Sequence, residues 1–114
     1  MESWGNLAII NLYGCNNSIK NKKKIKEFVA LLTKEIKMNP VGKTQIKRFG
    51  AGKLKGYSAI QFIETSSITI HFDERENRAF IDIFSCMPFN EKKVATFSRK
   101  FFKAEKSTAK MMKR

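Results

Sequence analysis

The sequence predicts an α+β fold in which two helices cover one face of an antiparallel sheet. Two stretches repeat apolar residues at helical spacing, and most other segments alternate apolar and polar residues as half-buried strands do. The chain has 114 residues, of which 42% are hydrophobic, so it can build one core between two layers. We therefore expect a single domain over residues 1–104 and a basic tail over residues 105–114.

The first half of the chain predicts a strand, a helix and a second strand. Residues 6–13 form a mostly apolar run between two glycines, which is typical of a buried strand. Residues 21–38 repeat apolar side chains at helical spacing with lysines on the other face, and the segment NPVG ends this pattern. Residues 43–49 predict a second strand, which a glycine-rich connection joins to the next.

The second half predicts three further strands and a helix. Apolar and polar residues alternate in three segments joined by short turns, which are residues 57–64, 67–72 and 79–85. Asn90 is a typical N-cap for the helix that follows, because its side chain can accept hydrogen bonds from the first backbone N–H groups. The tail is polar and basic, so we expect it to fray. This order of elements favours an α+β sandwich.

The net charge of +13 raises the question of a nucleic-acid partner, because lysine and arginine neutralise phosphates. The basic residues gather in three segments, which are residues 20–26, 43–55 and 92–114. No zinc-ligand spacing, aromatic RNA-binding signature or glycine-rich phosphate loop accompanies them. A solvated basic surface explains the charge without a nucleic-acid partner, and we expect no bound metal.

The sequence carries no sign of a membrane or a secretory route. Its N-terminus lacks the positive start and small-residue cleavage site of a secretory signal, and no apolar run reaches the eighteen or so residues of a membrane span. We therefore expect a soluble protein of the cytoplasm. The two cysteines, Cys15 and Cys86, are too few for a disulfide framework, so free thiols are expected.

The acidic residues are concentrated around the only histidine, His71. Five of the ten lie between residues 64 and 86, a placement that suits a cationic small molecule better than a phosphate backbone. Exposed turn and strand positions would explain them equally well, and both explanations stay open. The five are Glu64, Asp73, Glu74, Glu76 and Asp82.

Four residues of different chemistry stand at fixed intervals in the second half of the chain. Ser58, Ser66, His71 and Cys86 are separated by eight, five and fifteen residues. The segments SSITIH and IDIFSC around them follow the patterns Ser-His-(Leu/Ile)-(Ser/Thr)-Ile-His and (Ile/Val)-Asp-(Leu/Ile/Val)-Phe-(Thr/Ser)-Cys, except that Ser67 replaces the first histidine. On these motifs the chain resembles the prokaryotic S-adenosylmethionine decarboxylase family, over about residues 4–86.

The resemblance implies a proenzyme that makes a pyruvoyl cofactor from its own serine, without a metal. In such enzymes a serine hydroxyl attacks the preceding backbone carbonyl, and the resulting ester is eliminated and hydrolysed to a pyruvoyl group. Here the cleavage falls between Thr65 and Ser66. Ser58 would assist the attack, and His71 would be the base that removes the serine α-hydrogen.

The same resemblance assigns the later chemistry. The pyruvoyl ketone forms a Schiff base with the substrate amine and takes up the electrons left when carbon dioxide departs. Cys86 would then return a proton to the α-carbon, whereas a small buried hydrophobe on a strand is the alternative interpretation of this residue. The family acts in polyamine biosynthesis, specifically of spermidine.

The resemblance also implies that the functional unit is at least a homodimer. Family members pair their sheets, so dimerisation would complete the sandwich. A protomer of 114 residues has little room to surround a nucleoside on its own, which favours the same expectation.

The chain departs from the family on both sides of His71. Thr65 stands where the family usually has glutamate, and Ser67 where it usually has histidine. After His71 the family reads H-T-W-P-E, with an adenine-stacking aromatic and a ribose-binding glutamate, whereas this chain reads HFDERE. Phe49 matches the family's other adenine-stacking aromatic. We therefore expect substrate contacts from four residues, which are Phe49, Phe72, Asp73 and Glu74.

These departures leave three functions open. S-adenosylmethionine is the expected substrate, and ornithine or arginine decarboxylation on the same scaffold is the close alternative, because all three amino acids carry a distal positive charge. A non-catalytic, basic relative that binds nucleic acid is the alternative from another class. Only a self-processing decarboxylase yields two fragments, residues 1–65 and 66–114, on a denaturing gel.

Overall fold

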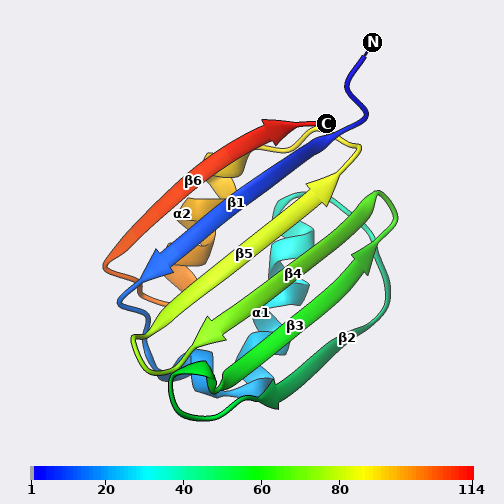
Figure 1. Ribbon diagram of the computed structural model, residues 1–114. Coiled ribbons are helices and arrows are strands. Elements are labelled where there is room, and N and C mark those ends of the chain that lie inside the picture. The colour runs from blue at the N-terminus through cyan, green and yellow to red at the C-terminus, as the bar shows by residue number, and fades with distance from the viewer. Residues whose placement is uncertain (1) are drawn as a thin grey trace.

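The structure, a computed structural model that describes residues 2–114, is a six-stranded sheet with two helices on one face. All neighbouring strands are antiparallel, in the order β2-β3-β4-β5-β1-β6 (Figure 1). The strands are β1 Asn6–Tyr13, β2 Pro40–Phe49, β3 Gly56–Ile63, β4 Ser66–Asp73, β5 Arg78–Ser85 and β6 Lys106–Lys113. The helices are α1 Lys22–Glu35 and α2 Glu91–Phe101, with 3-10 turns η1 Asn17–Lys20 and η2 Gly52–Leu54. The predicted α+β fold is confirmed.

Both helices begin at an asparagine cap, of which the sequence analysis predicted only Asn90. Asn21 accepts a hydrogen bond from the N–H of Lys24 at 3.1 Å, which caps α1. Asn90 accepts from the N–H groups of Lys92 and Lys93 at 2.9 and 3.2 Å, which caps α2 and confirms the predicted cap. Because each cap satisfies donors that the helix itself cannot, the helix starts are fixed locally.

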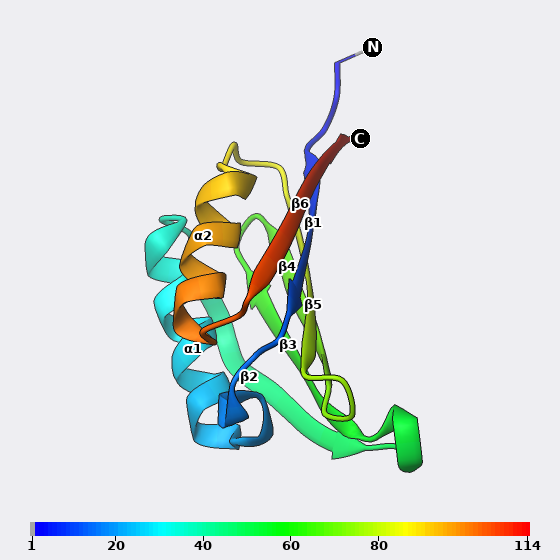
Figure 2. The same ribbon diagram turned by 90° about the vertical axis from the view of Figure 1, so that its left-hand side faces the viewer.

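The core lies between the helices and the sheet, as Figure 2 shows in side view. Alternate residues of each central strand point into it, for example Ile68 and Ile70 of β4, which are fully buried. Phe28 of α1 and Phe102 just after α2 meet there at 4.7 Å between ring centroids. Burying side chains of this size stabilises the fold by roughly 1.5–3 kcal/mol each.

The C-terminal segment does not fray, so that prediction is wrong. Residues 106–113 form β6, which pairs with β1 along its whole length and occupies one edge of the sheet. Met111, on the core side of β6, packs against the buried cluster, while Lys106 and Lys110 stand on the other face. The backbone of Arg114 also exchanges hydrogen bonds with that of Gly5, which brings the two ends of the chain together (Figure 1).

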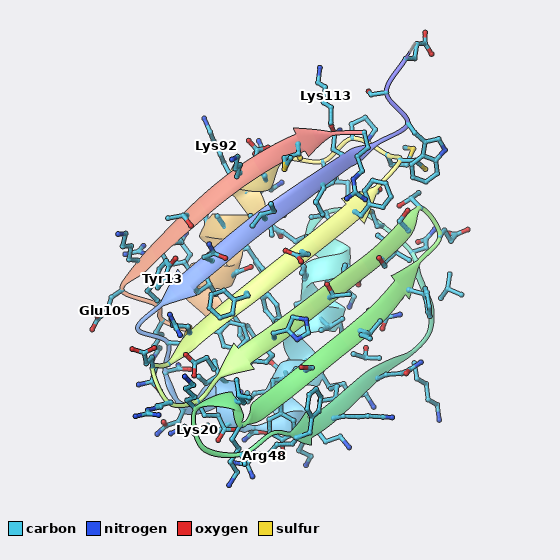
Figure 3. All side chains as sticks on the ribbon, viewed as in Figure 1. Tyr13, Lys20, Arg48, Lys92, Glu105 and Lys113 are labelled. Carbon is cyan, nitrogen blue, oxygen red and sulfur yellow. The ribbon has the colours of Figure 1, made fainter. Side chains whose placement is uncertain are left out.

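The helices leave the other face of the sheet open, and Figure 3 looks onto this open face. Several large apolar side chains stand on it, including Phe49 at 60%, Ile60 at 43% and Phe62 at 57% exposure. Contiguous exposed apolar surface of this kind usually marks an interaction site. Within residues 2–114 no helix has both the length and the apolar character needed to cross a membrane.

Candidate active site

The predicted catalytic residues form two separate groups at opposite ends of β4. Ser66 is the first residue of β4, and His71 lies five residues further along the same strand. A strand rises about 3.3 Å per residue, so these two residues are about 17 Å apart. The structure therefore brings Ser58 to His71 and Thr65 to Cys86, but it does not bring these two pairs together in one chain.

The first group is a serine–histidine pair on the open face. Ser58 of β3 stands directly opposite His71 of β4, and the Ser58 Oγ to His71 Nδ1 distance is 2.9 Å. The imidazole is exposed, and its other ring nitrogen has no hydrogen-bond partner within residues 2–114. An imidazole held on one side by a hydroxyl and open on the other can accept a proton from a neighbouring molecule.

A hollow of about 280 Å³ adjoins this pair. Phe49 and Ile60 supply its apolar wall, and Lys47 also lines it. The remaining lining residues are Gln45, Ser58, Thr69 and His71. This volume lies at the lower end of the roughly 300–1,000 Å³ of pockets that take drug-sized ligands.

The second group surrounds the predicted cleavage point, at the turn between β3 and β4. Only Glu64 and Thr65 separate the two strands, and the pairing resumes with Ile63 opposite Ser66. Ser66 has a φ angle of +156°, a region that L residues rarely occupy. The N–H of Glu64 donates to the carbonyl of Asn39 at 2.9 Å, which anchors the turn. The backbone is thus strained at the residue predicted to react.

The carbonyl of Thr65, which is the predicted target of the serine, is held from the end of β5. The backbone N–H of Cys86 donates to this oxygen at 3.1 Å. A hydrogen-bond donor aimed at a carbonyl oxygen stabilises the negative charge that develops there when the carbon is attacked. The Cys86 thiol is free and exposed, so the alternative interpretation of Cys86 as a buried core residue is wrong.

The Thr65 side chain is held as well, by a residue that stands at the Thr/Ser position of the motif IDIFSC but had no predicted role. Ser85, fully buried at the end of β5, donates from its Oγ to Thr65 Oγ1 at 2.7 Å. Thr65 Oγ1 also lies 3.5 Å from the sulfur of Met38. The signal that could have indicated Ser85 is its position, because it falls on the inward side of a strand whose other inward residues are apolar.

The four predicted substrate-binding residues differ in their placement. Phe49 lines the hollow beside His71, as expected of a stacking residue. Phe72 is 5% exposed and packs edge-on against Phe102 at 5.5 Å, on the helix side of the sheet. This placement contradicts the expectation that Phe72 contacts a substrate, because successive residues of a strand face opposite sides and His71 takes the open side.

The two predicted acidic contacts are already engaged in ion pairs. Arg78 binds Asp73 at 2.7 Å, and Arg48 binds Glu74 through two hydrogen bonds of 2.7 and 2.9 Å. The hydrogen bond from Arg48 holds the pKa of Glu74 below its usual range. Figure 3 shows Arg48 at the end of the sheet opposite to Lys113. These carboxylates are therefore neutralised within the chain, and neither lines the hollow beside His71.

These observations define a class of protein, an α+β domain whose open sheet face carries a serine–histidine pair and a strained serine turn. The sequence pattern of the S-adenosylmethionine decarboxylase family matches residues 6–114, and the chain belongs to that family. The family and the carboxy-lyase activity predicted from the motifs are thereby confirmed. No curated protein sequence matches the chain.

The fold has a solved counterpart. The chain is similar to the crystal structure of the adenosylmethionine decarboxylase from Aquifex aeolicus VF5, with a TM-score of 0.81 and 16% sequence identity. The likeness covers 100% of this chain and 92% of that one. At this identity the comparison shows a shared fold, including the C-terminal strand that the sequence alone did not predict.

Proposed function

We propose that this chain is a proenzyme that cleaves itself between Thr65 and Ser66 and then decarboxylates S-adenosylmethionine. The observation that carries the proposal is the hydrogen bond from the Cys86 N–H to the Thr65 carbonyl, beside the positive φ angle of Ser66. A polarised carbonyl next to a strained serine is what an intramolecular acyl shift requires. The residues present therefore fit the formation of a pyruvoyl group at Ser66.

The processing step is assigned to residues of the chain. Ser66 Oγ bonds to the Thr65 carbonyl carbon, whose oxygen becomes negative and is stabilised by the Cys86 N–H. The carbon–nitrogen bond then breaks, and the serine nitrogen leaves as a protonated amine, which gives an ester. A base removes the α-hydrogen of Ser66, and the Thr65 carboxylate leaves. Water hydrolyses the resulting enamine through its imine, releasing ammonia and leaving the pyruvoyl group.

The pyruvoyl group would supply the electron sink for decarboxylation. Around it, Cys86 is the proton donor to the α-carbon, because its thiol is exposed and its backbone N–H already contacts the Thr65 carbonyl. Phe49 stacks on the adenine in the hollow beside His71. An exposed phenyl ring suits a nucleoside better than the aliphatic chain of ornithine or arginine, which favours S-adenosylmethionine.

His71 is the base for processing, but it must come from a second subunit. Within one chain it lies about 17 Å from Ser66, far beyond proton-transfer reach. A twofold axis that lies between two such sheets, parallel to them and perpendicular to β4 near its middle, would exchange the two ends of that strand. Two open faces packed in this way bring the partner subunit's His71 to the end of β4 that carries Ser66, bury the exposed Phe49, Ile60 and Phe62, and enlarge the hollow.

The proposal is tested by mass and by released carbon dioxide. Purified protein should contain a fragment that starts at residue 66 and carries a ketone in place of its amino nitrogen, and Ser66→Ala should stay whole. The processed protein should release carbon dioxide from S-adenosylmethionine faster than from ornithine or arginine. An uncleaved wild-type chain after days of incubation refutes self-processing, and a preference for ornithine or arginine refutes the substrate assignment alone.

A further inference from the structure

We infer that Ser85 is a positioning residue for self-cleavage, because its buried hydroxyl joins the residue before the scissile bond to the loop that carries Cys86. The inference rests on the proposed self-cleavage and adds to it a residue outside the reacting groups. Ser85 stands opposite Ser66 in the pairing of β4 with β5, but within residues 2–114 its hydroxyl bonds to Thr65 and Met87 and not to the Ser66 hydroxyl. It acts through Thr65, whose side chain it binds at 2.7 Å.

The Ser85 hydroxyl both donates and accepts a hydrogen bond. Its Oγ donates to Thr65 Oγ1 at 2.7 Å and accepts from the backbone N–H of Met87 at 3.0 Å. The residue is fully buried, so no water competes for either bond. One hydroxyl therefore fixes the side chain before the cleavage point and the backbone just after Cys86 relative to each other.

Thr65 is consequently held at two independent points by adjacent residues. Its carbonyl accepts from the Cys86 N–H at 3.1 Å, and its hydroxyl accepts from Ser85. A rotation of the Thr65–Ser66 peptide that relaxed the +156° φ angle of Ser66 would pull the carbonyl away from Cys86. The Ser85 contact opposes that rotation from the side-chain end, which keeps the strained turn in its reactive shape.

The acyl shift depends on this arrangement. The Thr65 oxygen has to remain on the Cys86 N–H while its carbon becomes tetrahedral, and displacements near 1 Å can slow such a step by about 10²-fold. Loss of the Ser85 hydroxyl leaves the Cys86 N–H in place but frees both Thr65 and the loop at Met87. We expect cleavage to slow by roughly 10- to 100-fold, and not to stop.

The experiment compares cleavage rates of full-length chains in a cell-free translation. The fraction of residues 66–114 released is followed over time for wild type, Ser85→Ala and Ser85→Thr. Ser98→Ala is the matched control, because Ser98 is also fully buried but its Oγ has no hydrogen-bond partner within residues 2–114. Ser85→Ala should be slow, Ser85→Thr should restore most of the rate, and Ser98→Ala should match wild type.

A second variant removes the other partner of the same hydrogen bond, the more exposed Thr65, in case Ser85→Ala fails to fold. Thr65→Val removes the acceptor hydroxyl while keeping the shape, and it should slow cleavage by a similar factor. The double variant should be no slower than the slower single variant, because both remove one interaction. Hydroxylamine should release no additional fragment from the slowed variants, since the affected step precedes the ester.

The outcomes separate the two proposals. If wild type does not cleave, the proposed function fails. If wild type cleaves and Ser85→Ala and Thr65→Val both keep its rate, the role of Ser85 is refuted. It is also refuted if Ser98→Ala is as slow as Ser85→Ala, or if Ser85→Thr gives no recovery while its thermal midpoint equals that of wild type.

Discussion

The distance between Ser66 and His71 allows a direct test of the proposed shared site. Two chains that each lack one of these residues, Ser66→Ala and His71→Ala, should both remain uncleaved when made alone. When they are translated together at equal amounts, a mixed dimer contains one site with neither residue and one with both. In the complete site, Ser66 of the His71→Ala chain faces the intact histidine of the other subunit.

The expected amount of cleavage follows from random pairing. About half of the His71→Ala chains then sit in mixed dimers, so about half of them should be cleaved and no Ser66→Ala chain should be. The two full-length chains differ in mass, so intact mass spectrometry reads each one separately. The separation of about 17 Å allows no contribution from a histidine of the same chain.

Three results would contradict the proposed shared site. If the mixture remains whole while wild type cleaves, the two residues do not meet across subunits. If His71→Ala cleaves alone at the wild-type rate, His71 is not the base. Light scattering on the uncleaved Ser66→Ala chain should show at least a dimer at micromolar concentration, and a monomer there would contradict the packing of the open faces.

Four further outcomes are expected. Cys86→Ser should be processed, since the backbone N–H that contacts Thr65 is retained, but turnover should fall by roughly 10²- to 10⁴-fold, and a processed, fully active variant would remove Cys86 as proton donor. Phe49→Ala should raise the KM for S-adenosylmethionine of the cleaved protein, because Phe49 lines the hollow proposed to receive the adenine; an unchanged KM would contradict adenine stacking. Deletion of residues 105–114 should expose the edge of β1 and lower the thermal midpoint, and an unchanged midpoint would show that β6 contributes nothing. Burial raises the pKa of Cys15 to about 11, so iodoacetamide near pH 8 should label Cys86 and spare Cys15 in the native protein; rapid labelling of Cys15 would contradict that burial.

Most of the fold could be predicted because its strands alternate large apolar and polar residues. The strand β6 could not be predicted, because Ser107 and Ala109 occupy two of its inward positions, and small residues among lysines give little contrast. Its pairing with β1 also joins the two ends of the chain, which no local pattern can show. Composition suggested a frayed tail, whereas the free edge of β1 supplies hydrogen bonds that a frayed segment would leave unmade.

The site could be predicted residue by residue but not as an arrangement. The motif indicated Ser66 and His71 as members of one pattern. Both lie on the extended strand β4, however, so five residues of sequence separate them by about 17 Å. Alternation would have excluded Phe72, since it shares the inward parity of Ile68 and Ile70. The contact between Thr65 and Ser85 depends on the register of β4 against β5, which the sequence does not state.

In the proposed dimer, two chains of 114 residues form two complete sites because one hairpin of each chain supplies both halves of a site. The β3–β4 hairpin carries the reacting serine at its turn and the Ser58–His71 pair toward its open end, so the length of β4 sets the distance between them. In the proposed dimer a twofold axis near the middle of that strand brings Ser66 of each subunit close to His71 of the other, which gives two sites. The spacing of five residues between Ser66 and His71 is then a geometric requirement, because inserting a two-residue repeat into both strands would keep the alternation but shift the two halves by about 7 Å. Such a variant should fold and pair its strands, yet fail to cleave, which separates the geometry of the site from the stability of the sheet.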